Sequence, residues 1–588
     1  MGQYQLIITG KFKMRLIELR ANKKSFHTVS FNTRGITIIA AIKETNDQRK
    51  TYNSVGKSLT VALVHFCLGS NSINEFETKL SDWIFSLDFQ IGDVKYTSVR
   101  SANNQKEIEL NGEKYSVKDF NKFLEKELFR IKENSKFISY RGLIPRFIRY
   151  GEDGYITNDR YIKNEKPVTT LINNAFLLGL DTELVTKKAE LKEKENNIAD
   201  LKKQLENPEF KALFGTENKK DLEIKIVELE TIIKRYKKSI EDFVIADDYD
   251  AIRKEADKIS YELKQVKNKA TKFSIAISNI DKSLDIKPDI SKDKILQLYQ
   301  EAKVELGEMV IKKLNDVEEF NAQLLDNRTK KLIEERRFFE KQLSATNKII
   351  SKLGELEDEK LQYLKSNGAL EDYTKLNQAL TDNEKKLHAL NQYRKLTTDY
   401  KLAFEENKKD FTNENIVTNK YLEVAQDVIK NNIILFKSFV EKFYSEKNSG
   451  ITIDNNEGKN SVRYDIKAKI QDDAGNAVNE VKIFCYDWTI LKGRHNHNIN
   501  FLFHDSKITG DMDPRQIKTM LEIADQECRT HDFQYIISLN QNVIDNLKTE
   551  MEKEQHEKLV LDNIKLTLSD KSPEEKLLGI QIDLDYER

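Results

Sequence analysis

The segment ITIIAAIKETNDQRKTYNSVGKSLTVALVHFCLG, residues 36–69, decides the fold of this chain. It begins with an unbroken apolar and β-branched run, which predicts a buried strand. The residues after Gly56 change to helical spacing, and four apolar side chains fall near one face: Leu59, Leu63, Phe66 and Cys67. A strand, a polar loop ending in Gly-Lys-Ser and a helix therefore follow one another, which is the context of a phosphate-binding loop.

The end of this polar loop carries the groups that bind a nucleotide phosphate. Backbone N–H groups at a helix N-terminus attract the anion, while a lysine contacts the terminal phosphates and a hydroxyl binds Mg²⁺. Lys57 fits the lysine role and Ser58 the hydroxyl role. The candidate cofactor-binding residues are Asn53, Ser54, Val55, Gly56, Lys57, Ser58 and Leu59. Thr51 stands where the full pattern has another glycine, so an accidental surface turn is the alternative.

A second segment, NFLFHDS at residues 500–506, predicts a buried strand that ends in an acid. A carboxylate in this position holds Mg²⁺ beside a phosphate loop, so Asp505 is the candidate metal residue together with Ser58. An ordinary core strand that ends in a polar turn is the alternative. The hypothesis requires the chain to double back, because the two segments lie near opposite ends of the sequence.

Heptad spacing with interleaved Lys and Glu predicts a coiled coil between these segments. Apolar residues recur every seven positions at its start, at Leu184, Leu191, Ile198 and Leu205. The best candidate for the chain reversal is the segment 283–292, around Pro288. The predicted organisation is an α/β lobe at 1–180, an antiparallel helical arm at 181–445 and a second α/β lobe at 446–588.

Composition excludes several classes of protein. The 97 basic and 97 acidic residues cancel, so any contact with DNA needs a local patch. Cys67, Cys485 and Cys528 stand far apart without a CxxC pair, which argues against a disulfide framework and a zinc site. No apolar run approaches the ~20 residues that span a bilayer, and no signal-peptide core is present, so a cytoplasmic location is expected.

This order of motifs resembles the SMC-like ABC ATPases, which include RecN and the break-repair ATPase with a zinc hook. Three segments are similar to an uncharacterised C-terminal domain found on bacterial SMC-like ATPases, including those of three-component ABC conflict systems. They are VEEFNAQLLDNRTKKLIEERRFFEKQL (317–343), VKIFCYDWTIL (481–491) and NFLFHDSKITGDMDPRQI (500–517).

The resemblance implies a split ABC-type ATPase head, whose N- and C-terminal lobes are joined by the coiled coil. It implies ATP and Mg²⁺ as ligands, and a homodimer in which each ATP is capped by the signature loop of the other head. The candidate signature loop is DAGNAVNEV, residues 473–481, with Gly475 as its only glycine.

The sequence departs from the family's pattern at the residue that follows Asp505. The family places a catalytic Glu there to position the attacking water, whereas this chain has Ser506. The candidate catalytic residues are Lys57, Asp505 and Ser506. Slow hydrolysis, or hydrolysis through another group, is expected, and three substitutes remain unranked: His504, Asp511 and Asp513.

Two further departures concern the family's switch histidine and its Q-loop. Where the histidine follows the last core strand, this chain has Ser-Leu-Asn-Gln at 538–541. FISYRGLIPRFIRY, residues 137–150, lies near the Q-loop position but contains no Gln. Its basic residues, Arg141, Arg146 and Arg149, either meet phosphate or are solvated, and the solvated state is favoured.

The resemblance favours an ATPase that acts as an ATP-gated dimeric clamp or sensor on nucleic acid and partner subunits. Bacterial anti-phage or anti-plasmid defence, or DNA maintenance, is the implied setting, with DNA and a separate effector or accessory subunits as partners. The alternative is a nucleotide-binding structural or regulatory scaffold with little or no turnover, which Ser506 keeps open. A transporter subunit is disfavoured because a long coiled coil has no role there.

Overall fold

The computed structural model describes residues 13–43, 55–133, 135–149, 151–213, 221–241, 247–284, 308–365, 370–472, 475–582 and 584. The chain divides into two compact units. The first, here called the head unit, combines Met1–Lys202 with Tyr400–Arg588, and the second, the helical unit, is Lys203–Asp399. The two ends of the sequence therefore belong to one unit, as the double-back hypothesis requires.

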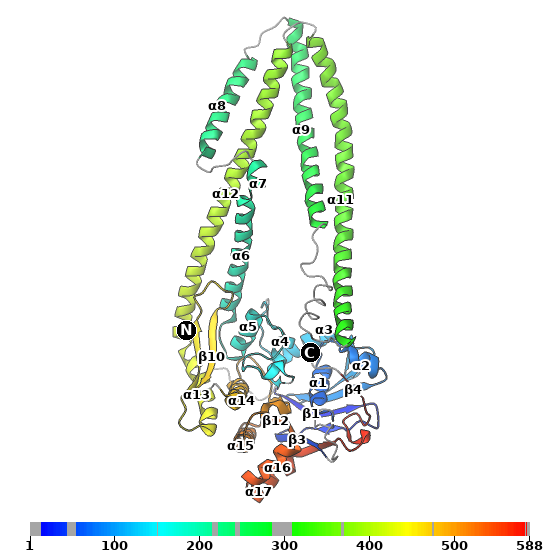
Figure 1. Cartoon of the computed structure of the whole chain (residues 1–588), viewed down its shortest axis with the longest axis vertical. Helices are drawn as coiled ribbons and strands as arrows, with labels where there is room; N and C mark the ends of the chain where they lie inside the picture. Colours follow the sequence, from blue (N-terminus) through cyan, green and yellow to red (C-terminus); the bar gives the residue numbers. More distant parts are fainter. Residues whose placement is uncertain are drawn as a thin grey trace. The chain divides into compact units, whose positions relative to one another are not determined.

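A parallel sheet at the centre of the head unit contains strands from both ends of the sequence (Figure 1). Its order is β13 (Ile564–Ser569), β3 (Gly35–Ile42), β12 (Gln534–Asn540), β11 (Phe501–His504) and β8 (Ile148–Arg149). All neighbouring pairs are parallel. β3 is apolar and buried along nearly its whole length, which is typical of a parallel strand covered on both faces. β12 separates β3 from β11, so the strands before the phosphate loop and before Asp505 are next-but-one neighbours.

A six-stranded antiparallel sheet is the second layer of the head unit. Its order is β2 (Val29–Ser30), β1 (Met14–Ala21), β4 (Ile84–Ile91), β5 (Val94–Ser101), β6 (Glu107–Leu110) and β7 (Glu113–Ser116). Helix α1 (Lys57–Cys67) contacts β3 and β8 of the parallel sheet and β4 and β5 of the antiparallel sheet. Because α1 is enclosed in this way, ten of its residues are buried, and the polar groups at its N-terminus are held in a fixed place.

Helices and one hairpin complete the head unit. Before the helical unit come α2 (Asn74–Lys79), α3 (Val117–Leu128), α4 (Tyr140–Leu143), α5 (Pro167–Leu177) and most of α6 (Thr182–Glu206). After it come α13 (Gln426–Phe443), β9 (Ser449–Asn455), β10 (Tyr464–Ile470), α14 (Asn476–Gly493), α15 (Pro514–His531), α16 (Gln541–Glu550) and α17 (Lys553–Leu559). α15 starts at a capping box, in which Asp513 and Gln516 each accept a backbone N–H from the other.

Helix α12 (Leu370–Val424) pairs with α6 in the head unit and with α8 (Leu222–Glu241) in the helical unit. Lys194 lies 3.8 Å from Asp410, and Lys237 lies 3.1 Å from Glu384. In both pairings residue numbers rise along one helix and fall along the other, as the further ion pairs Lys187–Glu414 and Glu223–Arg394 show. These antiparallel pairs agree with the predicted coiled coil, and Leu184, Ile198 and Leu205 of its predicted seam are buried.

The helical unit is more than one antiparallel pair. α9 (Asp247–Leu284) runs antiparallel to α11 (Glu308–Lys365), with ion pairs Glu255–Lys360 and Asp281–Arg336. α9 also runs parallel to α12, since Asp257 and Lys264 contact Tyr373 and Glu384. The short helix α7 (Pro208–Leu213) precedes α8.

The chain therefore reverses between α8 and α9, at a place where the sequence does not predict a reversal. The predicted reversal at 283–292 lies almost entirely outside the described residues.

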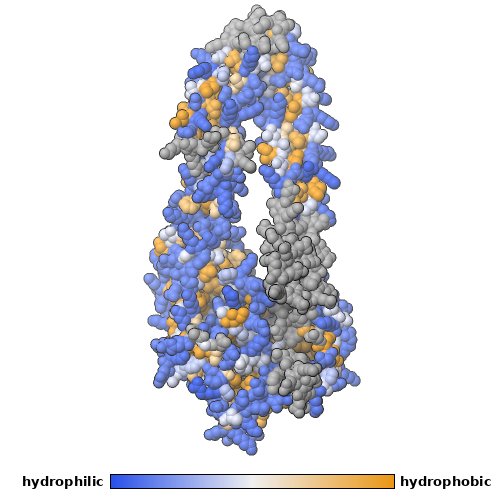
Figure 2. Space-filling model, viewed as in Figure 1, coloured by the Kyte–Doolittle hydropathy of each residue, from blue (hydrophilic) through white to orange (hydrophobic). Residues whose placement is uncertain are grey.

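The visible face of the described residues is mainly hydrophilic, with apolar side chains in small separate groups (Figure 2). No helix in the described ranges is both long enough and apolar enough to cross a membrane.

Candidate functional site

The backbone at the start of α1 is fixed by a glycine. Gly56 has φ 110°, a left-handed conformation that side chains rarely adopt, and a Cβ at this position would lie 2.5 Å from the Cβ of Leu577. The N–H of Leu577 donates to the carbonyl of Val55 at 3.0 Å. The segment around Leu577 thus packs against the end of the predicted phosphate loop and leaves no room for a larger residue than glycine.

The other predicted loop residues differ in which of their groups could contact a ligand. Asn53 and Ser54 lie outside the described residues. The side chains of Val55 and Leu59 belong to the hydrophobic core, so only the main chain of Val55 is available to a ligand, and Leu59 stabilises the helix.

Lys57 is the first residue of α1 and is 4 % exposed. Burial lowers the pKa of its ammonium group from 10.5 to about 8, and the nearby charge of Asp505 opposes this shift. A lysine at the N-terminus of a buried helix adds its charge to the positive end of the helix dipole. The position therefore favours an anion and carries a desolvation penalty while no anion is bound.

Ser58 and Asp505 meet although 447 positions separate them in the sequence. The Ser58 hydroxyl donates to Asp505 Oδ2 at 2.7 Å. Asp505 is fully buried, and its Oδ1 accepts the N–H of Ser506 at 2.7 Å, where a short 3₁₀ helix (Ser506–Thr509) begins. A hydroxyl and a carboxylate in contact at the edge of a parallel sheet form the donor pair that Mg²⁺ uses beside a nucleotide.

This donor pair fits a magnesium ion that shares its coordination with phosphate and water. Mg²⁺ prefers oxygen ligands and keeps several waters, so one carboxylate and one hydroxyl suffice when phosphate oxygens complete the shell. Within the described ranges, no group of three or more His, Cys, Asp or Glu side chains is placed to bind a metal. The three cysteines are buried and free. A site of the kind that binds zinc through several protein side chains is therefore absent from those ranges.

Two of the three candidate substitutes for the missing Glu, His504 and Asp513, are engaged elsewhere. His504 Nε2 lies 3.0 Å from Asp487 Oδ2 and Nδ1 lies 3.1 Å from the Tyr535 hydroxyl, and burial lowers the pKa of His504, which keeps the ring neutral. Asp513 caps α15. Ser506 has its hydroxyl 3.4 Å from Asp505 Oδ1 and brings no carboxylate.

A buried carboxylate that the sequence did not single out lies near the loop after Asp505. Glu480 is in the first turns of α14, and its Oε2 accepts the N–H of Asp511 at 2.9 Å. Burial raises the pKa of Glu480 to about 7. Glu480 belongs to the candidate signature loop, whose Gly475 is the N-cap of α14 and whose residues 473–474 lie outside the described residues. The apolar surroundings that shift this pKa have no local signal in the sequence.

Two unsatisfied polar atoms lie at the carboxyl end of β12, between β3 and β11. The buried Ser538 Oγ and Asn540 Oδ1 have no hydrogen-bond partner in the part of the chain that the structure describes. The strand register places Asn540 beside Ala41 of β3 and Ile537 beside His504 of β11. Ligands of open α/β sheets bind outside the carboxyl ends of the strands, and these two buried groups lie at the same edge of the sheet as Asp505.

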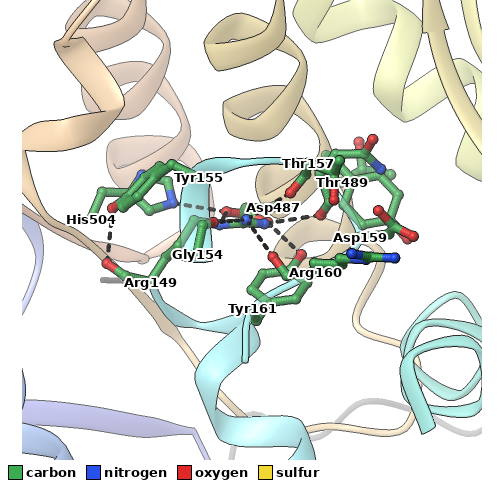
Figure 3. A network of polar contacts seen from close by, with 12 residues as sticks. Arg149, Gly154, Tyr155, Thr157, Asp159, Arg160, Tyr161, Asp487, Thr489 and His504 are labelled. Carbon is green, nitrogen blue, oxygen red and sulfur yellow. Dashed lines mark hydrogen bonds and ion pairs between the residues drawn. The ribbon is translucent and has the colours of Figure 1, made fainter. Parts of the chain in front are cut away.

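Two arginines of segment 137–150, Arg146 and Arg149, are buried and not solvated, which corrects the expectation from the sequence, whereas Arg141 is partly exposed. Arg146 is fully buried and forms a bidentate pair with Glu165 at 2.9 Å. Arg149 is equally buried and pairs with Asp487 at 2.7 and 2.8 Å (Figure 3). Arg141 is half-buried and donates to the carbonyl of Leu68 at 3.2 Å. These side chains organise the interior of the head unit and do not form a basic surface patch.

The chain is similar in part to one protein family and to several solved structures. Residues 439–582 match a family described as "Uncharacterised protein conserved in bacteria (DUF2326)". No curated protein matches the sequence. Similar solved structures include the Smc head domain with a coiled coil and joint from Pyrococcus yayanosii, at 13% identity and TM-score 0.37 over 98% of both chains.

A second similar structure is the Smc head domain from Pyrococcus furiosus with an extended coiled coil, bound to the C-terminal domain of ScpA. It matches at 10% identity and TM-score 0.33, over 95% of this chain and 93% of that chain. At these low scores the likenesses establish neither activity nor partners.

Proposed function

We propose that this protein is an SMC-like ATPase with a split ABC-type head, which binds ATP and Mg²⁺ at the N-terminus of α1. The observation that carries the proposal is the 2.7 Å hydrogen bond between Ser58 and Asp505. It joins the residue after the phosphate-loop lysine to an acid at the end of a parallel strand. Only a few kinds of site require a lysine, a hydroxyl and a carboxylate at one sheet edge, and a nucleotide site is the foremost of them.

Each residue of the site has a role that follows from its place. Lys57 binds the terminal phosphates from the start of α1, and the hydroxyl of Ser58 and the carboxylate of Asp505 hold the metal. Mg²⁺ at this position neutralises the charge on the phosphate oxygens. Ser538 and Asn540 supply unpaired polar atoms for the terminal phosphate or for water.

The dimeric clamp belongs to the same proposal. Two copies would close over two nucleotides, with the N-terminus of α14 near Gly475 facing the nucleotide of the other copy. Control of partner subunits, in bacterial defence or DNA maintenance, rests on the family resemblance. Contact with DNA loses its motivation from the sequence, because Arg146 and Arg149 are buried in ion pairs.

A nucleotide-binding scaffold with little turnover is the second candidate, and a specific observation favours it. No carboxylate follows Asp505, and the neighbouring His504 and Asp513 already serve the interior and a helix cap. If no other group activates water, the protein would bind ATP and release phosphate slowly or not at all.

Lys57→Ala tests the nucleotide site, with Lys24→Ala at an exposed position as the matched control. The measurement is the affinity for a fluorescent ATP analogue in the presence of Mg²⁺, followed by phosphate release. We expect Lys57→Ala to lose binding by at least about 100-fold, because a charge-assisted contact to phosphate is removed, and Lys24→Ala to bind like the wild type.

The same measurements separate the two candidates. Undiminished binding by Lys57→Ala would exclude this lysine from the site. Wild-type binding without phosphate release would leave the scaffold as the better description, and release that depends on Lys57 would establish the ATPase.

A further inference from the structure

The loop that follows β8, residues 151–162 and here called the bracket loop, is organised around a buried arginine. The guanidinium of Arg149 donates to four of the loop's carbonyl groups: Gly154, Thr157 (3.2 Å), Asn158 (3.0 Å) and Arg160 (3.1 Å). The five N–H groups of the guanidinium are shared between these carbonyls and the carboxylate of Asp487. The contacts therefore hold the main chain of the bracket loop to one buried side chain.

The bracket loop is attached to α14 by the same arginine. Asp487 of α14 accepts from Arg149 Nε and Nη2, and it also accepts from the hydroxyl of Tyr161 at 2.6 Å (Figure 3). Burial alone would raise the pKa of Asp487, but Arg149 and His504 outweigh it and the pKa is lowered, so the pair stays ionised. A second attachment comes from Asn479, which donates to the carbonyl of Ile156 at 3.1 Å.

Tyr155 connects the bracket loop to the metal carboxylate. Its hydroxyl accepts the N–H of Asp505 at 2.8 Å and donates to the carbonyl of Arg149 at 2.8 Å. The same Asp505 N–H lies 3.2 Å from that carbonyl. The hydroxyl of Tyr155 therefore links the carbonyl of Arg149, at the carboxyl end of β8, to the N–H of Asp505, directly after β11. It acts on the main chain of Asp505 and leaves both carboxylate oxygens to Ser58 and Ser506.

We propose that Tyr155 is a positioning residue that sets the carboxylate of Asp505 for the metal ion, an inference that rests on the proposed function. Mg²⁺ demands nearly ideal octahedral geometry at roughly 2.0–2.1 Å, so a small rotation of the Asp505 main chain misplaces its ligand oxygen. The groups that hold ligands in place commonly change metal affinity by about 10- to 100-fold when removed.

Tyr155→Phe tests this role in the full-length protein, because it keeps the ring and removes only the hydroxyl. The measurement is the Mg²⁺ concentration that gives half-maximal binding of a fluorescent ATP analogue. We expect this concentration to rise about 10-fold, with unchanged affinity for the analogue in EDTA. Hydrogen exchange of the peptide that contains Asp505 should be faster without nucleotide, since its N–H loses an acceptor.

Tyr161→Phe is the matched control, since it removes a hydroxyl of the same loop that contacts Asp487 and not Asp505. We expect it to lower the melting temperature without changing the Mg²⁺ requirement. An unchanged Mg²⁺ requirement in Tyr155→Phe would overturn the inference, and so would an equal shift in both variants, because general loosening would then explain it.

The failure of the proposed function looks different from the failure of the inference. If the wild type binds no ATP analogue, or binds it equally with and without Mg²⁺, the nucleotide site is wrong and the inference falls with it. If the wild type requires Mg²⁺ and Tyr155→Phe requires the same amount, the site stands and only the role of Tyr155 is refuted.

Discussion

At the scale of one residue, burial of the Lys57 ammonium group has an energetic cost for the folded protein. Its side chain is 4 % exposed, and burial lowers the pKa of the ammonium group, so the protonated form is less favourable in the folded protein than in water. In the proposed site, a bound polyphosphate would add a favourable interaction with this charge.

We predict that Lys57→Met makes the nucleotide-free protein more stable at pH 7. Folding lowers the pKa of Lys57 from 10.5 to about 8, so the penalty is complete below pH 8, shrinks as pH rises, and vanishes above pH 10.5. A shift of this size corresponds to about 3 kcal/mol, and it already includes the attraction of Asp505, which opposes it. The measurement is urea denaturation at several pH values, with Lys24→Met as control. A difference in the free energy of unfolding between Lys57→Met and the wild type that does not change with pH would contradict the prediction.

At the scale of one element, α1 depends on the glycine before it. Gly56 holds a left-handed conformation against Leu577, so the helix can start only where the chain turns sharply out of the loop. A β-carbon at position 56 would both strain the backbone and displace the side chain of Leu577.

We predict that Gly56→Ala weakens binding of an ATP analogue by at least about 10-fold and lowers the melting temperature, because both the φ angle and the space forbid a side chain. Gly354→Ala is the matched control: Gly354 lies inside α11, and nothing is within 4 Å of its added Cβ. That variant should gain about 0.5–1 kcal/mol of stability. Equal behaviour of the two variants would show that Gly56 is not constrained.

Elements with a clear period were predictable, and elements without one were not. The strand and helix around residues 36–69 and the strand ending at Asp505 follow from apolar spacing and turn residues. Helix α14 has no such signal, because a helix that is covered on several sides has no polar face to reveal its period. The state of Arg149 was mispredicted because its partner, Asp487, lies 338 positions away.

At the scale of the whole molecule, the head unit is built from two separated stretches of chain. β3 and β8 come from the first stretch, and β11, β12 and β13 come from the second, so β3 lies between two strands of the second stretch and β8 lies beside a third. Neither stretch alone supplies all five strands of the sheet. The arrangement of the helical unit was not predicted for a related reason. The reversal between α8 and α9 depends on which helices pair with one another, and a heptad pattern does not specify the pairing partner.

We predict that residues 203–399 can be replaced by a flexible linker of about six residues without loss of nucleotide binding. The ion pair Lys194–Asp410 brings the cut ends close, and packed helices lie about 8–10 Å apart. Every described residue of the proposed site stays in the head unit. The measurement is Mg²⁺-dependent binding of an ATP analogue. Residues 1–202 alone should not bind it, and loss of binding in the linked head would show that the site needs the helical unit.

The position of β3 between two strands from the end of the chain imposes a delay during synthesis on the ribosome. β3 ends at Ile42 and its neighbour β12 begins at Gln534, about 490 residues later. At roughly 5–20 residues per second, the nascent apolar strand waits on the order of 25–100 s for its partner. During that time its edge is open to pairing with other chains. Production of this protein in a cell is therefore expected to depend on chaperones that cover the first lobe until the last residues emerge.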